Sequence, residues 1–198
     1  MSAGLEFSQN WSAEILKSPP LIAPTRQFLY PQRIAGEEDA LGRGALQLMV
    51  RPANGGTFLA TCALGFTNPT MPTGVFACPK ANEMCAVAGG YAYVIDTERP
   101  EHCTHITLKP VVEVRELVPQ GLLLFVGFHS ITAWGRDGLA WESGRLSWEG
   151  VRIAGIGGDT LQGFGWNLMT DQEVAFSLDL LTGLHQDGGF PLPREKKN

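Results

Sequence analysis

Three tryptophans, Trp134, Trp141 and Trp148, follow one another at intervals of seven residues and are the clearest candidates for a binding site in this sequence. An indole offers a broad, weakly hydrated face that stacks on a sugar ring or anchors a protein partner. Charged side chains between the indoles could supply a polar rim. The predicted ligand-binding residues are Trp134, Arg136, Trp141, Glu142, Arg145 and Trp148. The other interpretation is that the tryptophans fill the core, as most large aromatic residues in small β domains do.

The glycines between the tryptophans exclude a helical heptad, because each one weakens a helix interior. Asp137-Gly138 instead favours a tight hairpin. A loop of these two residues would place Trp134 opposite Trp141, with both indoles on one face of the sheet. A wider loop from Gly135 to Gly138 would place Trp134 opposite Leu139. The sequence predicts the hairpin and leaves both registers open.

Other groups of residues give only weak evidence for a metal site or a catalytic site. In His102-Cys103-Thr104-His105, only Cys103 and His105 would share a strand face, and Cys78 and Cys85 are not spaced as a tight zinc-binding pair. We therefore expect no metal site and no cofactor. No G-x-S-x-G elbow is present, and the glycine pairs lack the lysine of a phosphate loop. Glu142, Glu149 and Asp159 could act as hydrolytic acids, but no motif distinguishes them from surface carboxylates.

The composition predicts an all-β domain that would position these residues. The chain has 198 residues, with 44% hydrophobic and only 18% charged residues, and it holds 24 glycines and 13 prolines. Such a profile is typical of short strands joined by tight turns. We expect about ten antiparallel strands in a β-sandwich or a twisted sheet of hairpin repeats. The longest segments that we interpret as strands include Met84 to Thr97, His105 to Leu117 and Gly121 to Trp134.

Three regions are expected along the chain. Residues 1–40 read as an irregular, proline-containing arm, residues 41–190 as a single all-β domain, and residues 191–198 as a polar tail. Asn54-Gly55-Gly56 marks a hairpin turn inside the domain. Leu122 to Val126 is apolar at every position, so this strand should be central, with both faces covered.

Several phrases resemble the strands of β-propeller blades. In Ala92 to Thr97 and in Val174 to Gly183, an apolar strand ends in Asp-Thr or in Asp-Leu-x-Thr-Gly, and the second phrase is similar to those that close blades in quinoprotein-like propellers. About eighty residues separate the two phrases, which corresponds to about two blades. The resemblance implies a small or partial β-propeller as the alternative fold. The chain departs from the pattern in having no strict repeat and no Trp-Asp dipeptide.

The charge and the apolar pattern restrict the partners. A net charge of −5 disfavours nucleic acid, which requires a basic surface. No segment approaches the roughly 18 apolar residues of a membrane span, and the first residues do not resemble a signal peptide. Four cysteines without an export signal are typical of buried thiols. The sequence therefore predicts a cytoplasmic protein.

Two functions follow from these observations. The first is a non-catalytic binding or protein-interaction module, whose ligand is a protein partner, a second copy of the same chain in a homo-oligomer, or a carbohydrate-like molecule. The alternative is a hydrolase that acts on a carbohydrate or a related polar substrate. Two converging carboxyls with a raised pKa would favour the enzyme, and a flat apolar surface would favour the module.

Overall fold

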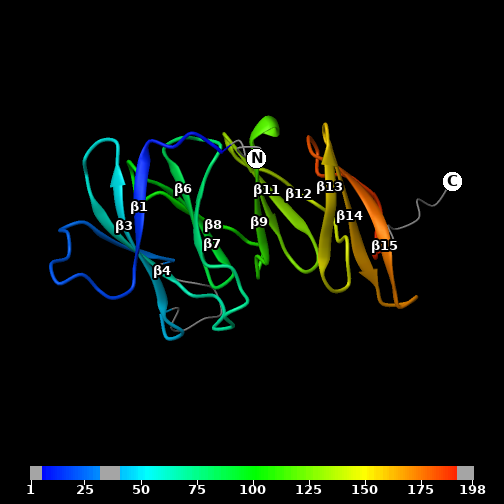
Figure 1. Ribbon diagram of the computed structural model, residues 1–198, viewed down its shortest axis with the longest axis horizontal. Helices are drawn as coiled ribbons and strands as arrows, with labels where there is room; N and C mark the ends of the chain where they lie inside the picture. The colour runs from blue at the N-terminus through cyan, green and yellow to red at the C-terminus, as the bar shows by residue number, and fades with distance from the viewer. Residues whose placement is uncertain (1–5, 32–40, 191–198) are drawn as a thin grey trace, which may run out of the picture.

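The computed structural model describes residues 6–31 and 41–190, and these residues form sixteen strands and one short 3-10 helix. The strands make four sheets of four strands each, which follow one another along the chain and lie side by side (Figure 1). The all-β prediction is confirmed. The row is open, because the first and fourth sheets lie at its opposite ends (Figure 1).

The first sheet combines the beginning of the chain with a hairpin. Its strand order is β1-β3-β4-β2, and β2 is parallel to β4 whereas the other pairs are antiparallel. The β3–β4 turn is the predicted one: Gly55 has a φ of 79°, and the side chain of Asn54 accepts a hydrogen bond from the amide of Gly56. The four strands are β1 (Trp11–Leu16), β2 (Gln27–Tyr30), β3 (Ala45–Pro52) and β4 (Phe58–Ala63).

The other three sheets are antiparallel meanders, in which each strand pairs with the next one along the chain. The second contains β5 (Gly74–Ala77), β6 (Glu83–Ala88), β7 (Tyr91–Asp96) and β8 (Cys103–His105). The third contains β9 (Glu113–Leu117), β10 (Leu122–Val126), β11 (Ile131–Gly135) and β12 (Gly138–Glu142), with the helix η1 (Val118–Gln120) between β9 and β10. The fourth contains β13 (Val151–Gly157), β14 (Thr160–Asn167), β15 (Gln172–Asp179) and β16 (His185–Asp187).

Alternation along the inner strands explains why the sheets stack. On β6, Met84 and Ala86 belong to the hydrophobic cluster shared with the first sheet, whereas Cys85 and Val87 belong to the cluster shared with the third sheet. A third cluster fills the space between the third and fourth sheets. Each inner sheet is therefore covered on both faces, as four-stranded blades of a propeller are. β10 is central and buried throughout, as predicted.

The strand count exceeds the expected ten for two reasons. Segments that looked continuous are divided by turns, for example at Gly89 and Gly90, both with positive φ, between β6 and β7. In addition, the first 40 residues were expected to be irregular, yet β1 and β2 lie there. The surrounding prolines led to the irregular assignment, and both strands lie at the edges of their sheet, where several side chains stay exposed. The predicted tail, residues 191–198, lies outside the described residues.

Candidate functional site

The hairpin between β11 and β12 has the second of the two registers considered for it. Trp134 lies opposite Leu139, and Trp141 lies opposite Ala133, so Ala140 is an additional residue that interrupts the ladder. Such a bulge turns the following side chain to the other face. The prediction that both indoles lie on one face of the sheet is therefore wrong. Trp134 packs between the second and third sheets, and Trp141 packs between the third and fourth.

Both of these indoles are buried, and each N–H has an acceptor. Trp141 donates from Nε1 to the carbonyl oxygen of Leu180 at 2.7 Å, and a Cβ at Gly183 would lie only 2.7 Å from its ring, so the β15–β16 turn covers it closely. Trp134 is 6% exposed and donates from Nε1 to Oε2 of Glu83 at 2.9 Å. Neither indole presents a free face for stacking on a ligand.

Arg145 and Trp148 form a separate cluster after β12. The guanidinium of Arg145 lies 4.7 Å from the centre of the Trp148 ring and 5.1 Å from that of Phe190. Glu142 lies on the exposed side of β12, where it accepts a hydrogen bond from the hydroxyl of Thr107 at 2.8 Å. The six predicted residues are thus divided among different surfaces. Only Trp134 and Arg136 line one pocket together.

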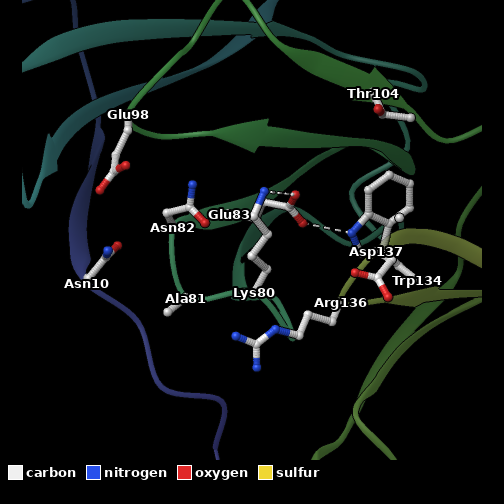
Figure 2. Close-up of a pocket in the computed structure, with 11 residues that line it drawn as sticks. Asn10, Lys80, Ala81, Asn82, Glu83, Glu98, Thr104, Trp134, Arg136 and Asp137 are labelled. Atoms are coloured by element: carbon white, nitrogen blue, oxygen red, sulfur yellow. Dashed lines mark hydrogen bonds and ion pairs between the residues drawn. The ribbon is translucent and has the colours of Figure 1, made fainter.

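That pocket is an open hollow of about 880 Å³ at the junction of the second and third sheets (Figure 2). The loop between β5 and β6, the loop between β7 and β8, and the β11–β12 hairpin all contribute to it. We call it the junction pocket. It is lined by Asn10, Lys80, Ala81, Asn82, Glu83, Glu98, Thr104, Trp134, Arg136, Asp137 and Gly138.

Glu83 occupies the centre of this site. Lys80 donates to its Oε1 at 3.3 Å, and Trp134 donates to its Oε2 (Figure 2). The main-chain carbonyl of Glu83 also accepts the indole N–H of Trp11 at 3.0 Å. Indoles from the first and third sheets therefore both bond to one residue of the second sheet. The charge of Glu83 is satisfied within the protein, because Lys80 and Trp134 each donate to its carboxylate.

A smaller pocket of about 260 Å³ adjoins the junction pocket and shares Lys80, Glu83, Thr104 and Trp134 with it. Asp96 lies there. Burial raises the pKa of its carboxyl, but hydrogen bonds from the side chain and amide of Arg99 and from the amide of Glu98 outweigh burial and hold this pKa below its usual value. Asp96 is thus an anion whose charge is already balanced.

Three charged side chains around the junction pocket have no partner among the described residues. Within the described ranges, the side chains of Glu98, Arg136 and Asp137 make no ion pair or hydrogen bond. All three are exposed. The sequence did not predict Glu98 or Asp137 as site residues, because nothing in their local pattern distinguishes them from ordinary surface acids. Only the packing of the second sheet against the third brings them to one pocket.

The described residues show no metal centre. Among residues 6–31 and 41–190, no group of three or more His, Cys, Asp or Glu side chains is placed to hold a metal ion. Cys103 is half-buried, and burial raises the pKa of its thiol to about 12. The ring of His105 stacks on Tyr93 at 4.8 Å between centroids. In the part of the chain that the structure describes, no helix is long and apolar enough to span a bilayer.

No protein-family model matches the chain, and no curated protein matches it. Among solved structures, the chain is similar to the N-terminal domain of Nup159, with 12% sequence identity and a TM-score of 0.36. The match covers 96% of this chain and 53% of that one, so this chain spans about half the length of that structure.

Proposed function

We propose that this protein is a non-catalytic binding module that recognises a protein partner through the junction pocket. The observation that carries the proposal is the set of exposed charged side chains without a partner among the described residues, Glu98, Arg136 and Asp137, around a hollow that Trp134 also lines. Interface positions are enriched in Arg, and charged groups around them select the partner.

The character of the pocket supports a macromolecular partner. Sites for small molecules are mostly apolar and enclosed, whereas this pocket is open and rimmed by charged and amide groups. The buried free thiols Cys62, Cys78 and Cys85 fit a reducing compartment, and the proposal therefore retains the cytoplasm as its location.

The hydrolase alternative has less support. A general acid requires a carboxyl with a raised pKa, and every described carboxyl with a shifted pKa, namely Asp96, Glu173 and Asp179, is shifted downward. A carbohydrate platform would require exposed indole faces, but Trp134 and Trp141 are buried. We therefore do not assign a catalytic residue.

The proposal is tested by quantitative affinity capture from extracts of the source cells, with bound proteins identified by mass spectrometry. Arg136→Glu should reduce capture of the specific partner by about tenfold or more, because a charge reversal at an interface costs several kcal/mol. Lys17→Glu is the matched control, since Lys17 is an exposed cation just after β1 that makes no ion pair with the described residues and does not line the pocket.

Equal capture by the Arg136→Glu protein and the wild-type protein would overturn the assignment to the junction pocket. Loss of capture by Arg145→Glu but not by Arg136→Glu would instead place the site at the Arg145 and Trp148 cluster. Thermal melting of each variant establishes that the fold is intact.

A further inference from the structure

The charges of the junction pocket divide into those balanced within the protein and those available to a ligand. Lys80 is paired with Glu83, and Arg99 is paired with Asp96. What remains is one cation, Arg136, and two anions, Glu98 and Asp137. A ligand of a single charge sign would meet repulsion from part of this set, so the pocket favours a ligand that carries both signs.

The positions of these side chains determine which charges a ligand meets at each side of the pocket. In Figure 2, Arg136 extends below Lys80 from the β11–β12 hairpin, whereas Glu98 projects from the opposite side of the pocket. Asp137 follows Arg136 in the turn of the same hairpin and lies between its stem and Trp134 in this view. An occupant that crosses the pocket therefore meets Glu98 at one side and, at the other, the guanidinium of Arg136 with Asp137 next to it.

Uncharged polar groups lie between these two ends. The amide side chain of Asn10 makes no hydrogen bond with the described residues. Asn82 uses its Nδ2 on Asp96 and leaves its amide oxygen available. Amide side chains both donate to and accept from a peptide main chain. The hollow of about 880 Å³ has room for more than one amino-acid side chain.

We propose that the junction pocket binds an extended peptide segment of a partner protein, which presents a basic residue to Glu98 and an acidic residue to Arg136. This proposal rests on the proposed function and adds the chemistry of the partner. The net charge of −5 on the chain opposes a purely acidic segment, and the guanidinium of Arg136 opposes a purely basic one.

The test uses short blocked peptides of equal length that carry one basic and one acidic residue, two basic, two acidic, or two glutamine residues. Binding is followed by the backbone amide NMR signals of Gly138 and Thr104, which line the pocket, with peptides at millimolar concentration. NMR titration detects such weak complexes. The mixed-charge peptide should bind most tightly to the wild-type protein, by about tenfold over the glutamine peptide.

Charge reversals make the test specific. Arg136→Glu leaves only anions unsatisfied, and it should transfer the preference to the doubly basic peptide. Glu98→Lys should move the preference toward the doubly acidic peptide. Asp159→Lys, a reversal at an exposed acid of the β13–β14 turn, should leave the order of the peptides unchanged. A misfolded variant would lose all binding, and non-specific attraction would respond equally to Glu98→Lys and Asp159→Lys.

The inference is overturned if the wild-type protein shows no preference for the mixed-charge peptide, or if neither reversal changes the order. Partner capture that still depends on Arg136 would then leave the proposed function standing and remove only the mixed-charge ligand. If the peptides keep their order of affinity but partner capture does not depend on Arg136, the proposed protein partner is overturned instead.

Discussion

Trp134 on β11 donates its indole N–H to the carboxylate of Glu83 on β6 at 2.9 Å, and this bond joins the third sheet to the second. The carboxylate has little exposure, with 12% of the Glu83 side chain accessible, and its other described partner is Lys80. A hydrogen bond to a partly buried charge is stronger than one between neutral groups. The contact therefore joins the second and third sheets beside the junction pocket, next to the hydrophobic cluster that fills the space between them.

Trp134→Phe should lower the free energy of unfolding by about 2 kcal/mol, because the carboxylate of Glu83 loses a donor and remains partly buried. Urea denaturation measures the change. Trp166→Phe is the control, since Trp166 is half-buried and its indole makes no hydrogen bond to the described residues. Equal losses in the two variants would show that the bond to Glu83 contributes nothing specific.

Gly165→Ala should destabilise the fourth sheet. A Cβ at Gly165 would lie 2.1 Å from the carbonyl oxygen of Leu146, a main-chain atom that cannot move aside independently. Overpacking of this kind costs about 2 kcal/mol or more. At Gly155, on β13, a Cβ would meet nothing within 4 Å, so Gly155→Ala should change the stability little. A Gly165→Ala protein as stable as the Gly155→Ala protein would contradict the close approach of these segments.

The carboxyl of Asp96 should make the free energy of unfolding depend on pH. Its carboxyl pKa is lower in the folded chain than in the unfolded one, so the folded state favours the anion. The stabilisation is fully present above the unfolded pKa of about 4 and is lost as the pH falls through the lower, folded value. Urea midpoints from pH 7 to about pH 3 should therefore converge for wild-type protein and Asp96→Asn. A constant difference across this range would contradict the assignment.

The thiols should be slow to react in the native protein. Cys62, Cys78 and Cys85 are buried, and burial raises the pKa of each thiol, as it does for half-buried Cys103. The reactive thiolate is therefore scarce at neutral pH. Iodoacetamide labelling followed by mass spectrometry should modify all four only after unfolding. Rapid native labelling of a buried thiol would indicate that the sheets separate readily.

The sequence by itself determined the all-β class, the Asn54-Gly55 hairpin and the central strand Leu122 to Val126, because turn residues and apolar alternation act locally. It did not determine the register at Trp134. Two loops were compatible with Asp137-Gly138, and a bulge at Ala140 then turned Trp141 toward the fourth sheet. The local pattern of residue types does not predict a bulge, because the bulge is stabilised by packing on the two faces of the sheet.

The junction pocket was decided by tertiary structure alone. Arg136 and Trp134 were predicted as site residues, but Lys80, Glu83 and Glu98 join them only through the stacking of the second sheet on the third. A charged side chain acquires its role from the charges that surround it, and these come from segments far apart in sequence. The chain therefore encodes its strands locally, whereas the pairing of Glu83 and the gathering of Arg136 and Glu98 at one pocket exist only once the sheets have packed.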